Sequence, residues 1–255
     1  MSHMLHKKYI LECCADSVES ALNAHEGGAD RLELCGNLVI GGTTPSLFLF
    51  EEIRKKSDIN IHVLIRPRFG DFLYTDYEKN IMKKEVKMFK MAGAEGVVVG
   101  ALDKYGNLDI EFMKELIDIA EDMKVVLHRA FDVCKDPFKT LEQSISLGID
   151  TILTSGQQNN CLLGLDLIKK LDESSNGKIK IMAGSGMNSE RMKEFLEKTS
   201  VKCFHMSAKN ILESEMEYRN PNVSMGMPGL SEYEIWRTDK EEIRRAGEIL
   251  KSYEK

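Results

Sequence analysis

The sequence has no long apolar run and no excess of positive charge. No apolar stretch reaches the roughly 18 to 20 residues that a membrane-spanning helix needs, and the first residues lack the pattern of a secretory signal. The 35 basic residues are interleaved with 41 acidic ones, which gives a net charge of −6. These absences argue against a membrane or nucleic-acid partner, and they predict a protein that stays in the cytoplasm.

Cysteine is scarce, and the cysteines are not spaced as in a zinc ribbon. The chain has six cysteines and no Cys-x-x-Cys pair, which excludes a zinc ribbon. In the reducing cytosol we expect all of them to be free thiols. They are Cys13, Cys14, Cys35, Cys134, Cys161 and Cys203.

The beginning of the chain does not belong to the predicted domain. Met1-Ser2-His3-Met4 resembles the remnant of a cleaved purification tag, with the natural start at Met4. We therefore exclude residues 1–4 and assign 5–255 to one domain. A chain of 255 residues is long for one domain, but it is an ordinary length for an α/β barrel.

Short apolar, β-branched runs alternate with segments of helical period along the whole chain. Eight such runs fall at 9–13, 31–35, 61–66, 96–101, 125–130, 151–154, 179–183 and 202–207. Helix-start residues such as Thr75-Asp76 and Asp136-Pro137 open several of the intervening segments. Eight alternations predict a (β/α)₈ TIM-type barrel, because a doubly wound open sheet usually has fewer strands.

The connection 211–237 breaks this regular alternation. It is rich in Asn, Pro, Gly and Met, and it is too long for a bare linker. We expect it to pack across one end of the barrel and to serve a contact between subunits.

The first two predicted strands carry the same Glu-x-Cys pattern. Side chains alternate faces along a strand, so Glu12 shares a face with Cys14, and Glu33 shares one with Cys35. If the carboxylates point into the barrel, so do these thiols, whereas Cys13 should face the helices. Active sites of such barrels lie at the carboxyl ends of the strands, where these residues are placed.

The two inward thiols allow two interpretations. Neighbouring strands lie about 4.8 Å apart, so Cys14 and Cys35 could hold one ion between them, and soft thiolates favour Cu(I). Alternatively, both are small buried hydrophobic residues, as free cysteines often are.

An arginine follows the third strand. We expect Arg66 to be the counter-ion of Glu12 or Glu33, because a buried carboxylate is costly to ionise alone. Such a charge cluster at the barrel rim is typical of a substrate clamp. It could also be a paired cluster that fills the barrel.

Two histidines end strands, one in the fifth and one in the eighth. His128 and His205 are candidates for general acid–base chemistry or for metal ligation, and Asp132 and Arg129 lie close to the first in sequence. We interpret His25 and His62 as structural, because they lack such neighbours.

A glycine-containing turn follows the seventh strand. Gly184, Ser185 and Gly186 precede a helix start, and Ser207 ends the eighth strand. Glycines let backbone amides approach a ligand, and many barrels hold phosphate at this place. The pattern predicts an anion site here, with a tight structural turn as the alternative.

These strand ends together resemble the CutC family, named for copper homeostasis, and the resemblance runs from Leu11 to about Tyr233. The resemblance implies a cytoplasmic TIM-type barrel, often oligomeric, that binds Cu(I) through cysteines at positions 14 and 35. Met206 stands where some relatives have a cysteine, and Ser185 interrupts a turn that is often a triple glycine. The matching motifs are Asp16-Ser17-Val18-Glu19-Ser20-Ala21, Gly28-Ala29-Asp30-Arg31-Leu32-Glu33-Leu34-Cys35, Gly41-Gly42-Thr43-Thr44-Pro45-Ser46, the runs 66–74 and 128–132, and Leu153-Thr154-Ser155-Gly156.

Two functions of different class therefore compete. The first is a copper-binding or trafficking protein that uses Cys14 and Cys35. The second is an enzyme acting on a small anionic or phosphorylated substrate, which needs acid–base groups and a clamp. The candidates for these roles are Glu12, Glu33, His128 and His205 as acids or bases and Arg66 as the clamp.

Overall fold

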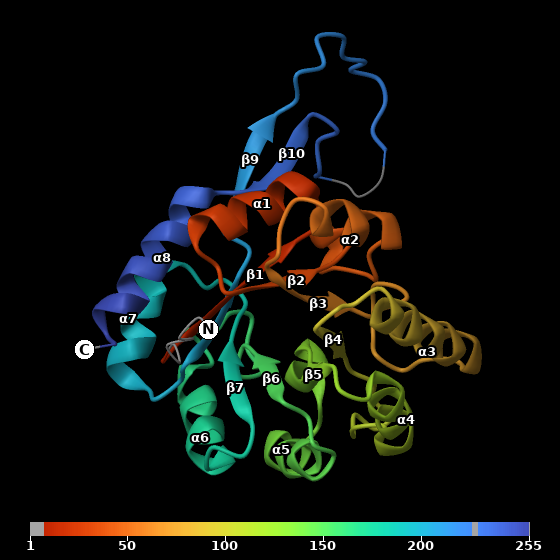
Figure 1. Cartoon of the computed structure of the whole chain (residues 1–255), viewed down its shortest axis with the longest axis vertical. Coiled ribbons are helices and arrows are strands. Elements are labelled where there is room, and N and C mark those ends of the chain that lie inside the picture. Colours follow the sequence, from red (N-terminus) through yellow and green to blue (C-terminus); the bar gives the residue numbers. More distant parts are fainter. Residues whose placement is uncertain (1–7, 226–228, 255) are drawn as a thin grey trace.

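The computed structural model describes residues 8–225 and 229–254, so the predicted tag remnant 1–4 lies outside the described residues. Eight parallel strands close into a barrel in chain order, with β1 hydrogen-bonded to β8 (Figure 1). The (β/α)₈ prediction is confirmed, and each predicted strand overlaps an observed one. The strands are β1 (Ile10–Ala15), β2 (Arg31–Leu34), β3 (Asn60–Leu64), β4 (Gly96–Val99), β5 (Lys124–Leu127), β6 (Thr151–Thr154), β7 (Lys180–Ala183) and β8 (Cys203–Met206).

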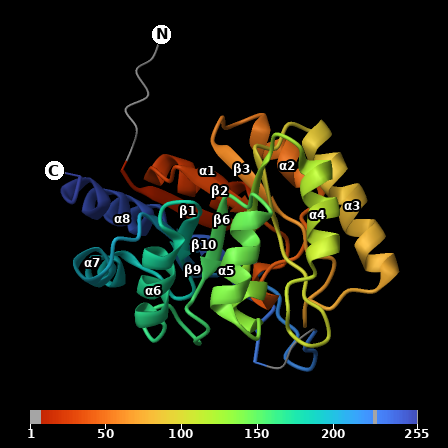
Figure 2. The ribbon, with the colours of Figure 1, turned by 90° about the horizontal axis from the view of Figure 1, so that it is seen from below.

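Helices surround the strands as an outer ring (Figures 1 and 2). Their first turns are capped as the sequence predicts: Thr75 and Glu78 form a capping box, and Asp136 accepts two amide hydrogen bonds. No described helix is long and apolar enough to cross a membrane. The helices are α1 (Val18–Gly27), α2 (Leu47–Arg54), α3 (Asp76–Met91), α4 (Ile110–Ala120), α5 (Pro137–Ser146), α6 (Leu165–Ser175), α7 (Ser189–Lys198) and α8 (Lys240–Ser252), with short 3₁₀ turns η1 (Leu38–Ile40) and η2 (Arg129–Val133).

The alternation of side chains along the strands divides the core into two regions. Outward residues such as Leu11 and Cys13 pack under the helices in the larger region. Inward residues form a smaller apolar region inside the barrel, and Cys35 belongs to it. The predicted facing of Cys13 and Cys35 is thus confirmed. The inner region comprises Cys35, Leu64, Val98, Val126, Leu153, Met182 and Cys203.

The segment after β8 forms an arm, which we define as residues 209–238. Its two ends pair as antiparallel strands, β9 (Lys209–Glu213) and β10 (Glu234–Thr238). The arm projects outward past α1 (Figure 1), and its loop lies at the lower edge of Figure 2. The expectation that this segment crosses a barrel end is wrong, because Arg237 and Thr238 tie its base to the side of α1 through Glu19, Asn23 and Ser20.

The contact between α1 and α8 depends on a residue without a side chain. A Cβ added at Gly27, the last residue of α1, would lie 2.8 Å from the Lys240 carbonyl oxygen and 2.8 Å from Ile243 Cβ. We expect Gly27→Ala to lower the free energy of unfolding by about 1 to 3 kcal/mol through overpacking. Chemical denaturation would measure the change.

Gly247 provides the matched control, because it lies within α8 and an added Cβ would meet nothing within 4 Å. Gly247→Ala should stabilise the protein by up to about 1 kcal/mol, since alanine is the better helix former. Equal effects of the two substitutions would contradict the close helix packing at Gly27.

Candidate functional site

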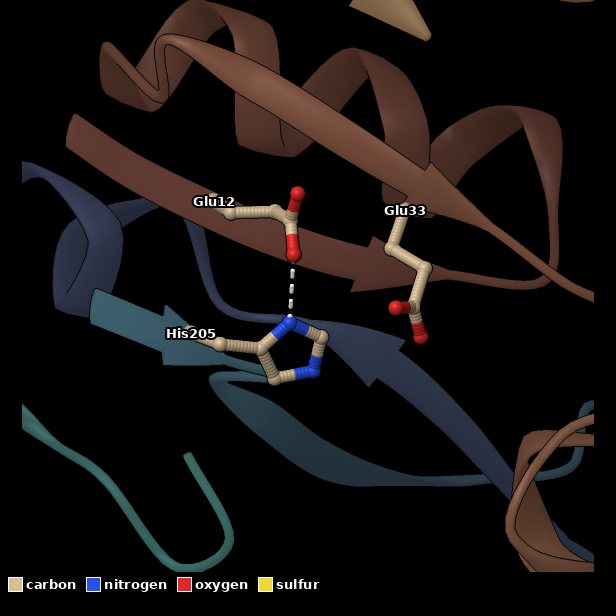
Figure 3. Close-up of side chains that lie close together, drawn as sticks. All are labelled: Glu12, Glu33 and His205. Atoms are coloured by element: carbon tan, nitrogen blue, oxygen red, sulfur yellow. Dashed lines mark hydrogen bonds and ion pairs between the residues drawn. The ribbon is translucent and has the colours of Figure 1, made fainter. Parts of the chain in front are cut away.

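A cluster of charged side chains occupies one side of the barrel interior (Figure 3). Glu12 on β1 lies opposite Arg31 on β2 and opposite His205 on β8 in the strand register. Glu12 Oε1 is 2.7 Å from His205 Nδ1, and Oε2 accepts a hydrogen bond from Arg31 Nε. The Glu12 side chain is fully buried, so its charge is balanced entirely by groups inside the protein.

The charge state of Glu12 follows from these neighbours. Burial raises the pKa of the Glu12 carboxyl, but Arg31 and His205 more than offset this and hold that pKa at about 2. Glu12 is therefore a carboxylate at neutral pH. Its two oxygens fix the orientation of one guanidinium and one imidazole.

His205 is the cationic partner in this cluster. Burial lowers the pKa of His205, whereas Cys14, Glu33 and Glu12 raise it, and the net pKa lies well above the ordinary value. The ring is consequently an imidazolium that donates to Glu12 through Nδ1. Its other nitrogen lies on the side of the ring that faces Glu33 (Figure 3).

Glu33 differs from Glu12 although both are buried carboxyls. In the register it lies opposite Cys14 on β1 and His62 on β3. Burial raises the pKa of Glu33, His205 lowers it and Glu12 raises it, with a net pKa of about 7. Its Oε2 atom has no hydrogen-bond partner among the described residues. Glu33 is thus a carboxyl group able to take up or release a proton near neutral pH.

Arg31 and His62 complete the cluster. Neither was predicted from the sequence to be a site residue. The prediction that His62 lacks charged neighbours is wrong, because it points into the barrel opposite Glu33. Burial and Arg31 lower the pKa of His62 to about 4, so its ring is neutral. Arg31 lies two residues before Glu33 on the same strand, so the alternation of side chains predicts that both face the barrel interior. This is the sequence signal that identifies the arginine.

Arg66 does not pair with either carboxylate, so the predicted counter-ion is wrong. Arg31 holds that position, because it starts β2 next to Glu12, whereas Arg66 lies beyond the end of β3. The terminal nitrogens of Arg66 donate instead to the carbonyl oxygens of Gly41, Gly42 and Gly70. Arg66 is nevertheless buried at the barrel rim, as expected for a residue at a strand end.

His128 lies apart from the charged cluster. It follows β5, stacks on Phe72 with ring centroids 4.9 Å apart, and accepts the Ala130 amide at Nδ1 at 3.1 Å. Burial and Arg66 lower the pKa of His128 to about 3, which leaves it neutral. The structure therefore does not support His128 as an acid–base partner of His205. Its sequence neighbour Asp132 is occupied by hydrogen bonds from Arg129, Thr154 and Ser155.

Both predicted thiol ligands are buried beside the charged cluster. Cys14 lies opposite Glu33 and contributes to the electrostatics of His205. Cys35 directly follows β2, and its thiol is 3.6 Å from the Ala15 carbonyl oxygen. Burial, Cys14 and Glu33 raise the pKa of the Cys35 thiol well above its ordinary value. Cys35 is thus protonated at neutral pH.

The residues predicted to bind an anion face two different regions of the molecule. Gly184 backs the cluster, since a Cβ there would lie 3.2 Å from His205 Cβ. Gly186 and Ser207 instead line a groove of about 1260 Å³ between α7 and α8. At the start of α7, the Ser189 amide already donates to the Glu242 carboxylate at 2.7 Å. Ser185 adopts a positive φ of 75° and donates its hydroxyl to Asn159. Anion binding here stays a prediction.

Similarity to known proteins identifies the family of this chain. The sequence matches the CutC family over residues 9–210. The chain belongs to the CutC family. A CutC family protein of Bacteroides fragilis (strain YCH46) is 46% identical over 89% of this chain and 92% of its own length. The human copper homeostasis protein cutC homolog is 42% identical over 96% of this chain and 90% of its own length.

A solved structure agrees with this assignment. A Streptococcus agalactiae protein named for CutC copper homeostasis superposes with a TM-score of 0.74 and 32% identity, over 78% of this chain and 98% of its own. The barrel and the predicted family are thus confirmed together.

Two of these relatives are named for copper homeostasis, so we examine the donor atoms inside this barrel as ligands for Cu(I). Ligand atoms of Glu12, Glu33 and His205 lie within 4.8 Å of one another. Carboxylates are poor matches for Cu(I), the His205 imidazole is protonated, and Glu12 already binds Arg31. Cys14 and Cys35 have the soft sulfur that Cu(I) prefers, but the metal would have to displace the Cys35 proton. Among the predicted ligands and the members of the charged cluster, the two thiols are the groups that suit Cu(I).

The charge balance of the cluster predicts a large loss of stability when Glu12 is neutralised. Glu12→Gln would leave Arg31 and His205 buried beside a neutral amide, and we expect the free energy of unfolding to fall by about 3 to 5 kcal/mol. Chemical denaturation at neutral pH would measure it.

Glu26→Gln is the matched control, because the Glu26 pair with Lys240 lies at the surface, where solvent screens it. This variant should unfold at nearly the wild-type midpoint. A Glu12→Gln protein as stable as the Glu26→Gln protein would refute the central role of the Glu12 charge.

Proposed function

We propose that this member of the CutC family is an enzyme that transfers protons on a small anionic substrate, with Glu33 and His205 as its acid–base pair. The observation that carries the proposal is the unpartnered, buried Oε2 of Glu33 beside an imidazole that Glu12 holds at 2.7 Å. A buried polar atom without a partner costs about 1 to 3 kcal/mol, so the fold retains it at the expense of stability. Such sites are typical of function.

The two groups have complementary roles in this proposal. Glu33 is the general base, because its pKa of about 7 lets it exist as a carboxylate or as an acid under ordinary conditions. His205 is the general acid, since its ring is protonated and oriented by Glu12. Arg31 keeps Glu12 ionised and so acts through it as a positioning residue. The reactions that fit are isomerisations and eliminations at carbon.

The close packing around the pair limits the substrate to a small molecule. Gly184 presents only backbone to His205, and an added Cβ would lie 2.6 Å from the Leu153 side chain. The surrounding inward residues are buried. An anion is favoured because His205 is a cation inside the barrel and Arg66 is a cation at its rim, as the clamp interpretation of Arg66 requires.

Metabolite profiling tests this activity even though the substrate is unidentified. The purified protein, incubated with a small-molecule extract, should convert at least one small acid, followed by mass spectrometry and by deuterium incorporation from D₂O. The conversion should rise with pH through about 7, where Glu33 loses its proton.

Glu33→Gln should abolish the conversion, and His205→Gln should lower it at least a hundredfold, as removal of a general acid does. Glu26→Gln is the surface control and should behave as wild type. An extract left unchanged by the wild type, or one changed equally by the Glu33→Gln protein, would overturn the proposal.

Copper binding is the second candidate, favoured by the copper homeostasis name of the human relative and by the location of two thiols inside the barrel. Cys14 and Cys35 would hold Cu(I) as thiolates, with the Cys35 proton released on binding. This candidate places the protein in the cytoplasm, where thiols stay reduced. A homo-oligomer is part of the same proposal, supported by exposed apolar residues of the arm such as Met216 and Tyr218.

Anaerobic Cu(I) titration with a competing chelator tests the thiol site. Cys14→Ser and Cys35→Ser should each lose the tight site, whereas Cys134→Ser, in the connection after η2, should bind as wild type. Unchanged stoichiometry and affinity in the first two variants would exclude the thiol site.

A further inference from the structure

Three buried polar atoms at the rim of the barrel have no hydrogen-bond partner among the described residues, and none belongs to the Glu33–His205 pair. They are Arg66 Nε, the Tyr74 hydroxyl and His128 Nε2. The three side chains are at least nine-tenths buried, with exposed fractions of 9%, 5% and 5%. Each unsatisfied buried group costs about 1 to 3 kcal/mol, so three near one another require an explanation.

The three side chains form one group around the connection from β3 to α3. Phe72 packs against two of them, with the Arg66 guanidinium carbon 5.1 Å from its ring centroid and the His128 ring centroid 4.9 Å from it. The Tyr74 hydroxyl lies against the Arg66 guanidinium and can accept from it while keeping its own proton to donate, and His128 interacts electrostatically with Arg66. Arg66 is therefore the member that connects the other two, at the carboxyl end of the barrel.

Arg66 is a cation without a counter-ion. Its two terminal nitrogens donate to the backbone carbonyl oxygens of Gly41, Gly42 and Gly70, and no carboxylate pairs with it among the described residues. Arg68, on the same loop, has carboxylate partners in Asp71 and Glu78. Leaving a buried charge unpaired is strongly destabilising, so an anion from outside the chain is the missing partner.

The other two groups are donors of the same kind. His128 Nδ1 accepts the Ala130 amide, so the proton of the neutral ring resides on Nε2, which can only donate. The Tyr74 hydroxyl is a donor as well. One fixed positive charge and three free donor groups match a group with one negative charge and two oxygens. A phosphate carries about −1.5 to −2 charges and would leave part of its charge unbalanced.

We propose that Arg66, Tyr74 and His128 form the recognition subsite for a single carboxylate group of the substrate. The inference rests on the proposed acid–base function and specifies its substrate class. The reacting carbon would lie toward Glu33 and His205, while the carboxylate is held at the rim by Arg66 Nε, the Tyr74 hydroxyl and His128 Nε2. His128 is thereby a binding residue instead of an acid or base.

Binding of glycolate, as the smallest hydroxy acid probe, tests the subsite. We expect saturable binding to the full-length wild type by isothermal titration at constant ionic strength, and weaker binding of inorganic phosphate. Arg66→Met should weaken glycolate at least tenfold, which is the effect of about 1.4 kcal/mol. Tyr74→Phe removes one oxygen atom, leaves the ring packing intact, and should weaken glycolate by about twofold to tenfold.

Arg244→Met is the control, since this arginine lies on α8 and has its own carboxylates in Glu241 and Glu248, and it should bind glycolate as wild type. If the Arg66→Met protein does not fold, the glycolate affinity of the Tyr74→Phe protein still tests the subsite. The subsite is refuted by no saturable glycolate binding to wild type, by phosphate binding more tightly than glycolate, or by unchanged affinity in Tyr74→Phe.

Glu33→Gln separates this inference from the proposed function. Glycolate should still bind this variant at least as well as wild type, because Glu33 is outside the subsite and carries negative charge. If glycolate binding depends on Tyr74 and Arg66 but no conversion depends on Glu33, the subsite stands and the acid–base function fails. If conversion depends on Glu33 but Tyr74→Phe leaves the affinity for glycolate unchanged, the subsite alone fails.

Discussion

The Glu12 carboxylate inside the barrel is the constraint on which the site depends. It is fully buried, and its two oxygens bind an arginine from β2 and a histidine from β8. These strands are its two neighbours in the closed barrel, so the ion pairs join the first strand to the second and to the last. Because Glu12 stays charged, the His205 ring stays oriented, and Cys14, Glu33 and Glu12 together keep its pKa well above the ordinary value.

The interior of the barrel is divided between stability and chemistry. Apolar side chains such as Val98, Val126 and Met182 fill one side as in an ordinary packed core. Charged side chains from β1, β2 and β8 fill the other, with Glu33 adjacent and incompletely hydrogen-bonded. A barrel built only for stability would replace such groups by apolar residues, which is often neutral or favourable. Their retention is the physical basis of the proposed catalytic role.

The rim adds a second set of groups with the same character. Arg66, Tyr74 and His128 retain free donors, while the loops that contain them are otherwise well hydrogen-bonded. The terminal nitrogens of Arg66 thus bind backbone carbonyl oxygens of the surrounding loops, and its Nε is left for a ligand. The thiols Cys14 and Cys35 belong to the first two strands and lie between the charged cluster and this rim, so a metal and a carboxylate substrate would compete for adjacent space.

The sequence by itself determined the eight strands, most helix starts and the inward facing of Cys35, because periodicity and capping are local properties of a few residues. It also identified Glu12, Glu33 and His205 as strand-end candidates. Only the tertiary structure decided that Arg31 and not Arg66 neutralises Glu12, that His62 lies inside, and that His128 is separate from His205. Those outcomes depend on strand register and on the position of each residue along its strand, which bring together residues up to 193 positions apart. No local pattern encodes that distance.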